Sequence, residues 1–115
     1  MEFDVEGERP TAGVAVVSVV GEVDLHVASV LRERLTTAVD GADKVVIDLS
    51  GVTFVDSMAL SVIVGAGKRA RARRAVVRLV VPRREIRRVF EITLLDRVFP
   101  LDESREAALA AVQDG

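Results

Sequence analysis

The chain has 115 residues, a formal net charge of −2 and no cysteine, and half of its residues are hydrophobic although only four are aromatic. This composition favours one compact α/β domain over a disordered or fibrous chain, and the missing cysteines exclude disulfide bonds and thiolate metal sites. No apolar stretch approaches the roughly 20 residues of a membrane span, and the first residues are acidic where a signal peptide would be basic, so we expect a single cytoplasmic domain over residues 1–115.

Two strands are predicted near the start of the chain. Phe3–Val5 and Val14–Val20 are rich in β-branched and apolar residues. A polar segment between them contains Pro10 and Gly13, which are typical turn residues. We therefore expect the two strands to be joined by a turn.

A helix, a strand and a second helix follow. The apolar residues from Val27 to Val39 recur at helical spacing and form one stripe, and we expect Asp24 to cap this helix. Residues 44–50 are β-branched and almost continuously apolar, which is typical of a strand covered on both faces. Residues 57–74 then predict a long helix.

The last third of the chain repeats the alternation. Residues 75–82 predict another buried strand, and Pro82 suits the start of the helix that follows. A short strand is predicted over residues 97–101, where Pro100 confines it to an edge, and Asp102 is expected to cap a final helix. The order ββαβαβαβα predicts helices packed against a mixed, largely parallel central sheet.

Charge is unevenly distributed along the chain. Residues 1–56 carry eleven acidic and four basic side chains, whereas residues 68–88 carry ten basic side chains and one acid. The first of these cations close a helix, where its dipole favours them, but those of residues 83–88 open the next helix, where cations are mildly unfavourable. The second group therefore indicates a partner surface. An acidic protein would fit it, whereas nucleic acid has less support because the chain lacks Trp and Tyr.

No enzyme is expected from the sequence. His26 is the only histidine, so a Ser-His-Asp arrangement with Ser57 has little support. The carboxylates are scattered without the spacing of metal ligands. The segment GAGKRA (65–70) lies within a helix and lacks the spacing of a phosphate-binding loop, so no cofactor is expected either.

Two interpretations compete for Ser57, which lies between Asp56 and an apolar helix. Asp and Ser are both among the best helix N-caps, so the pair needs no function. The first two turns of the helix, however, are apolar nearly all the way round, which is more than one stripe facing a sheet requires. The excess must be covered by a neighbouring helix or offered to another protein. A phosphate of about −1.5 to −2 charges on Ser57 would then weaken such a partner's binding.

Three motifs, in order and over nearly the whole chain, resemble those of the STAS-domain anti-sigma factor antagonists of bacteria. They are GEVDLHVASVLRERL (21–35), VVIDLSGVTFVDSMAL (45–60) and RVFEITLLDRVFPLDESREAALAA (88–111). The resemblance implies an α/β fold of STAS type, with a mixed, largely parallel central sheet and helices packed mainly on one face.

For function, the resemblance implies a switch. The unphosphorylated domain would bind an anti-sigma factor that is also a serine-protein kinase, and so release a sigma factor. Phosphorylation of Ser57 would end this binding, and a separate phosphatase would reset it. Neither nucleic acid nor a membrane is expected as a direct partner. The residues that we expect at the partner-binding site are Asp24, Asp56, Ser57, Met58, Leu60 and Ser61.

The chain departs from the family motifs at four positions. Ala59, Ser61 and Leu94 stand where glycine is frequent, and Met58 stands where serine or threonine is usual. Alanine in place of glycine stabilises a helix by about 0.5–1 kcal/mol, whereas Met58 alters the face that a kinase reads. The alternative function is a STAS scaffold or sensor domain that is never phosphorylated and acts through protein–protein contacts alone.

Overall fold

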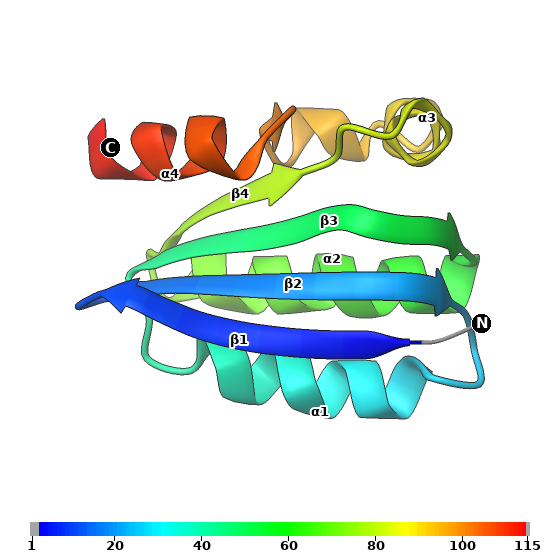
Figure 1. Ribbon diagram of the computed structural model, residues 1–115, viewed down its shortest axis with the longest axis horizontal. Helices are drawn as coiled ribbons and strands as arrows, with labels where there is room; N and C mark the ends of the chain where they lie inside the picture. The colour runs from blue at the N-terminus through cyan, green and yellow to red at the C-terminus, as the bar shows by residue number, and fades with distance from the viewer. Residues whose placement is uncertain (1–2, 115) are drawn as a thin grey trace.

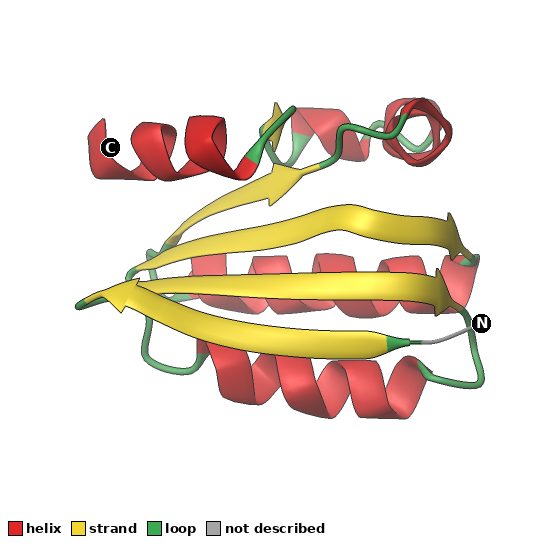
Figure 2. Cartoon of the chain, in the orientation of Figure 1, coloured by secondary structure: helices red, strands yellow, loops and turns green. Residues whose placement is uncertain are grey.

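The computed structural model describes residues 3–114, which form one mixed sheet with helices on both faces (Figure 1, Figure 2). Within this range the strands are β1 (Asp4–Thr11), β2 (Val14–Val23), β3 (Lys44–Val55), β4 (Val76–Val80) and β5 (Leu101–Asp102), in the spatial order β1-β2-β3-β4-β5. The helices are α1 (Ala28–Val39), α2 (Ser57–Ala72), α3 (Arg84–Ile92) and α4 (Arg105–Asp114), with a short 3-10 helix, η1 (Leu95–Arg97). β1 is antiparallel to β2, and the other neighbouring strands are parallel. The predicted α/β class and largely parallel sheet are confirmed.

The helices are distributed unequally between the two faces of the sheet. Buried residues of α1, α2 and α3, among them Leu31, Ile63 and Phe90, pack with one face of the sheet into the main core. Of the helices described, only α4 lies on the opposite face. Its buried Ala108 and Val112 form a smaller cluster with one valine from each of β2, β3 and β4. Helices therefore lie mainly on one face, as predicted.

Helix α2 is apolar nearly all the way round because other elements cover it on several sides. α1 packs along it, β3 and β4 contact it, and the ring of Phe99 lies against Gly67. Val62 and Val64, on nearly opposite sides of the helix, are both buried. Neighbouring elements thus cover most of the apolar excess seen in the sequence, and Met58 in the first turn stays half exposed.

The strands of the first half are longer than predicted. β1 runs through Pro10, which an edge strand tolerates, and its pairing with β2 is irregular between Glu8 and Thr11. The turn to β2 is tighter than expected and uses Gly13 at a φ of +79°, a left-handed conformation that favours glycine. β3 continues to Val55 and so reaches the start of α2 almost directly.

The C-terminal segment differs most from its prediction. No strand extends over residues 97–101; η1 occupies the beginning of this segment, and only the two-residue β5 pairs, at the sheet edge. Asp102 does not cap α4, because its carboxylate pairs with Arg78 at 2.6 Å, a hydrogen bond that raises the pKa of this guanidinium. Ser104 caps the helix instead, and its hydroxyl accepts a hydrogen bond from the backbone N–H of Ala107 at 3.1 Å.

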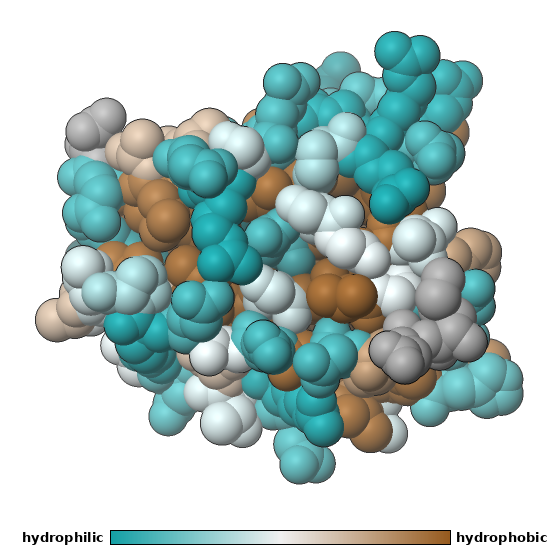
Figure 3. Space-filling model, viewed as in Figure 1, coloured by the Kyte–Doolittle hydropathy of each residue, from teal (hydrophilic) through white to brown (hydrophobic). Residues whose placement is uncertain are grey.

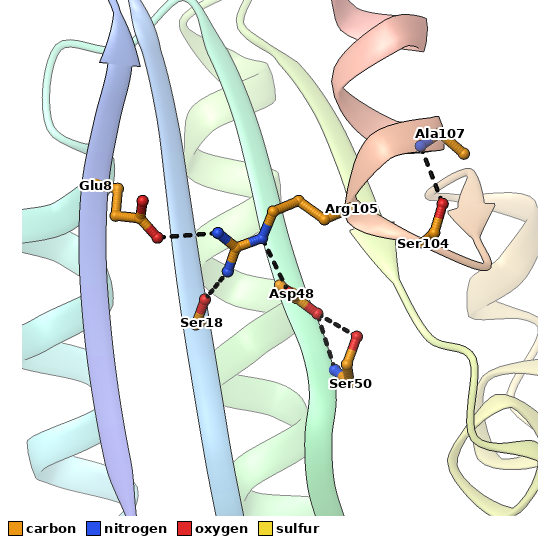
Figure 4. Close-up of polar contacts among 7 residues, drawn as sticks. All are labelled: Glu8, Ser18, Asp48, Ser50, Ser104, Arg105 and Ala107. Carbon is orange, nitrogen blue, oxygen red and sulfur yellow. Dashed lines mark hydrogen bonds and ion pairs between the residues drawn. The ribbon is translucent and has the colours of Figure 1, made fainter.

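A polar network fastens α4 to the sheet (Figure 4). Arg105, in the first turn of α4, donates hydrogen bonds to Glu8 on β1 at 2.9 Å, to Ser18 on β2, and to Asp48 on β3 at 3.3 Å. Asp48 is 8% exposed and also accepts from the backbone N–H and the hydroxyl of Ser50. Burial alone would lower the pKa of Arg105, but the hydrogen bonds and charges of Glu8 and Asp48 outweigh this effect and raise it. The charged guanidinium therefore links three strands to α4.

Replacement of Gly67 by alanine tests the close packing of Phe99 on α2. A Cβ atom at residue 67 would lie 2.7 Å from Cε1 of the buried ring. Overpacking of this kind costs about 1–3 kcal/mol, which exceeds the gain of about 0.5–1 kcal/mol for alanine over glycine in a helix. We expect Gly67→Ala to lower the free energy of unfolding measured by urea denaturation.

Gly65→Ala is the matched control in the same helix. Only the guanidinium tip of Arg69 would contact the new Cβ atom, at 3.4 Å. We therefore expect this variant to gain about 0.5–1 kcal/mol. A gain of stability in both variants would show that the ring of Phe99 does not pack on α2 as described.

Candidate functional site

The parallel pair of β2 and β3 brings two distant segments of the chain together. Their register runs to Val23 opposite Val55, and the backbone N–H of Asp56 donates to the carbonyl of Val23 at 3.2 Å. The loop from β2 to α1 and the first turn of α2 therefore meet at the carboxyl ends of these strands, on the right in Figure 1. This edge of a parallel sheet is where α/β domains usually place their binding residues.

Asp56 joins the two segments through both of its carboxylate oxygens. Oδ1 accepts a hydrogen bond from the backbone N–H of Ala59 at 2.9 Å, which caps α2. Oδ2 accepts from the backbone N–H of Leu25 at 2.8 Å. The backbone of Asp56 is extended, with φ −96° and ψ 177°, which is typical of an N-cap residue. One side chain thus begins the helix and holds the loop of residues 24–27 against it.

Ser57 does not cap the helix, although the sequence left that role open to it. It is the first residue of α2, and it is exposed. The N–H group that an N-cap bonds is taken by Asp56. Among the hydrogen bonds of residues 3–114, none involves the hydroxyl of Ser57, so this group is available to another molecule.

Three large apolar side chains, which we call the apolar rim, lie exposed on the segments that meet here. Leu25 belongs to the loop before α1, Phe54 to the end of β3 and Met58 to the first turn of α2, and they are 62%, 51% and 48% exposed. Exposed apolar side chains that gather in this way mark contact surfaces. Sequence reasoning identified Met58 but missed the other two residues. The sequence did contain a signal for both: each is a large apolar residue within two positions of an aspartate in a family motif.

The other predicted site residues differ in their placement. Asp24 is half-buried and does not cap α1; its Oδ1 accepts from the backbone N–H of His26 at 2.9 Å within the loop. Ser61 is exposed, and its hydroxyl donates to the carbonyl of Met58 at 2.8 Å. Leu60 is only 8% exposed and packs in the main core. Leu60 is therefore not part of the exposed surface around Ser57.

The described residues contain neither a metal site nor a membrane-spanning helix, and their cleft lies away from Ser57. Within residues 3–114, no group of three His, Cys, Asp or Glu side chains is placed to hold a metal ion, and none of the helices is long and apolar enough to cross a membrane. A cleft of about 380 Å³ lies between β1 and α1, lined in part by Gly7, Arg9 and Ala38. The lining of this cleft includes neither Ser57 nor a residue of the apolar rim.

Comparison with known proteins identifies relatives along almost the whole chain. The model of the STAS domain family matches residues 8–108. The anti-sigma-F factor antagonist RsfB of Mycobacterium tuberculosis is 35% identical over 105 residues, which cover 90% of this chain and 84% of RsfB. The anti-sigma-B factor antagonist of Bacillus subtilis is 29% identical over 93 residues, which cover 81% of this chain and 85% of the relative.

A solved structure shares the complete architecture. The crystal structure of an anti-sigma factor antagonist from Mycobacterium paratuberculosis matches with a TM-score of 0.88 at 32% sequence identity, and the match covers 97% of this chain and 95% of that one. The range matched by the family model contains Ser57, Asp56 and the whole apolar rim.

The division of roles between Asp56 and Ser57 predicts different stabilities for their alanine variants. Asp56→Ala removes a cap, worth about 1 kcal/mol, together with a hydrogen bond from Leu25 to a charged group. We expect a loss of about 2 kcal/mol in the free energy of unfolding, measured by urea denaturation. Ser57→Ala is expected to change it by less than about 0.5 kcal/mol, as for an ordinary surface residue. Equal losses of unfolding free energy in the two variants would indicate that Ser57 also caps α2.

Proposed function

The chain belongs to the STAS domain family, and on this premise we propose that it is an anti-sigma factor antagonist. Its unphosphorylated form binds an anti-sigma factor through the surface around Ser57, and the sigma factor is thereby released. The anti-sigma factor is also a serine kinase and transfers the γ-phosphate of its bound ATP to the hydroxyl of Ser57. A separate phosphatase restores the free hydroxyl. The chain itself is a cytoplasmic binding protein and catalyses no reaction.

The free hydroxyl of Ser57 is the observation that supports this proposal. A phosphoacceptor must be exposed and must give up its proton without damage to the fold. Ser57 meets both conditions because it is exposed and because the capping hydrogen bond of α2 belongs to Asp56. The kinase therefore approaches an oxygen that the chain itself does not use.

A phosphate at this position is compatible with the folded chain. Ser57 begins a helix of 16 residues, and the dipole and the unpaired N–H groups at a helix N-terminus favour an anion. The neighbouring carboxylate of Asp56 opposes the phosphate as a like charge. Both oxygens of this carboxylate accept hydrogen bonds from backbone N–H groups, which moderates the repulsion. We expect the phosphorylated chain to keep its fold.

The same phosphate is incompatible with a partner that covers the apolar rim. Such a partner removes Leu25, Phe54 and Met58 from water, and this burial stabilises the complex. The phosphate would then have to lose its hydration among apolar side chains, at a cost of several kcal/mol. Because each 1.4 kcal/mol changes affinity tenfold, phosphorylation acts as a switch that leaves the fold intact.

The alternative function is a STAS scaffold or sensor domain that binds proteins without being phosphorylated. Met58 is the feature that favours it, because this exposed residue stands next to Ser57 where the family usually has serine or threonine. A flexible apolar side chain changes the surface that a kinase must recognise. The alternative shares the apolar rim with the main proposal and differs from it only at Ser57.

Phosphorylation of the purified chain tests the proposal. Each anti-sigma factor of the genome that encodes the chain is mixed with it and with ATP, and mass spectrometry locates the phosphate. We expect phosphate on Ser57 and an affinity for the same anti-sigma factor that falls at least about 100-fold, since burial of the dianion costs several kcal/mol. Isothermal titration calorimetry measures both affinities.

Ser57→Ala is the control for this experiment. It should bind the anti-sigma factor as the unphosphorylated chain does and accept no phosphate. Tight binding without phosphate transfer to the unmodified chain would support the scaffold function instead. Phosphate on another residue, with Ser57 unmodified, would show that Ser57 is not the phosphoacceptor and would overturn this part of the proposal.

A further inference from the structure

Helix α3 carries a charged face that the proposed function does not yet use. Ile86 and Phe90 fix its buried side in the main core. Arg84, Arg88 and Ile92 follow one another at intervals of four residues, and all three are exposed. Residues four apart lie on the same side of a helix, so these side chains form one exposed stripe. Figure 3 shows hydrophilic side chains gathered over α3, at the upper right of the view.

Arg84 and Arg88 of this stripe, and Arg83 just before the helix, are not explained by the fold. Arg83 and Arg84 stand at the N-terminus of α3, where the helix dipole disfavours cations, and Arg84 and Arg88 repel each other across one turn. Within residues 3–114, no ion pair or side-chain hydrogen bond is found for these three residues. Arg87 provides the contrast, because its Nε donates to the carbonyl of Val81 at 3.2 Å.

An apolar tip follows the arginines at the end of α3. Ile92 is 71% exposed and Leu94 is 53% exposed. Leu94 also has a φ of +61°, a left-handed conformation that is unfavourable for leucine and suits glycine. Two large apolar side chains thus stand in water, one of them on a strained backbone, beside exposed cations.

We propose that Arg83, Arg84, Arg88, Ile92 and Leu94, which we call the α3 surface, form a docking site for an acidic protein surface. On the proposed function, on which this inference rests, that surface belongs to the anti-sigma factor. α3 contacts β3 and lies toward the end of the molecule at which β3 reaches α2 (Figure 1). On this proposal one partner contacts both the α3 surface and the apolar rim.

The chemistry of the α3 surface favours protein over nucleic acid. The aromatic ring of α3, Phe90, is fully buried and offers no stacking platform to a base. The apolar tip has no counterpart on a nucleic acid backbone, whereas protein interfaces combine an apolar centre with charged neighbours.

The test compares two double variants that each remove two positive charges. Arg84→Ala/Arg88→Ala changes the α3 surface. Lys44→Ala/Lys68→Ala is the control, because these lysines lie at the start of β3 and in the later half of α2. Association with the anti-sigma factor bound by the unmodified chain is followed by stopped-flow fluorescence over a salt series. We expect the arginine variant to associate about tenfold more slowly at low ionic strength, with a weaker salt dependence.

Stability and dissociation complete the test. The arginine variant is expected to melt at the same or a higher temperature, because it loses the cation of Arg84 from a helix N-terminus and the repulsion between Arg84 and Arg88, so slower association will not reflect unfolding. Ile92→Ser is expected to raise the dissociation rate severalfold and leave the association rate unchanged. Equal association rates of the two double variants would overturn the inference and leave the proposed function standing.

Two further outcomes are decisive. If no anti-sigma factor binds the unmodified chain, the proposed function fails, and this inference fails with it. Fluorescein-labelled single-stranded and duplex DNA of about 20 nucleotides per strand are titrated at the same salt concentrations. This length exceeds the roughly 4–16 nucleotides that a single-strand-binding domain covers. DNA binding that the arginine variant loses and the lysine variant keeps would assign the α3 surface to nucleic acid and overturn the inference.

Discussion

The parallel alignment of β2 with β3 is the constraint on which the rest of the molecule depends. Because both strands run in the same direction, the loop that leaves β2 and the helix that follows β3 start at one edge of the sheet. The hydrogen bond from Asp56 to the carbonyl of Val23 ties these two segments at that edge. The crossover through α1 then lies beside α2 on the same face. Parallel strands need such a cover, since they are apolar on both sides, and α4 covers part of the other face.

This arrangement separates the stability of the fold from the state of Ser57. If the hydroxyl of Ser57 capped α2, a phosphate on it would break a helix cap, and phosphorylation would reduce the stability of the chain. The carboxylate of Asp56 takes the cap instead and uses its second oxygen to hold Leu25. The two adjacent residues therefore divide the work: one maintains the helix and the loop, and the other is free to be modified. The departures of Ala59 and Ser61 from glycine lie within the same well-capped helix and do not disturb this division.

The sequence predicted what depends on local pattern and failed where tertiary contacts decide. Hydrophobic periodicity placed the helices and the central strands, because each buries its own apolar face. The sequence assigned the cap of α4 to Asp102, but the carboxylate of Asp102 pairs with the distant Arg78, and Ser104 caps the helix instead. Leu25 and Phe54 also escaped notice, because sequence shows that a residue is apolar and does not show that no other element covers it. Ser57 could be identified from its motif, whereas its freedom from capping required the hydrogen bonds of Asp56.

In the proposed complex, the apolar rim and the α3 surface contribute to binding through different physics, and this difference fits a switch. Attraction between charges acts over about 10 Å at moderate salt and mainly raises the rate of association. Apolar contact acts only at short range and mainly determines how long the complex lasts. A phosphate on Ser57 lies among the apolar side chains of the rim, so it shortens the lifetime of the complex most directly. The cations of α3 are unaltered by that modification and still draw an acidic partner toward the chain. On the proposed function, the unphosphorylated chain therefore captures its partner quickly and holds it, whereas the phosphorylated chain meets the same partner and releases it.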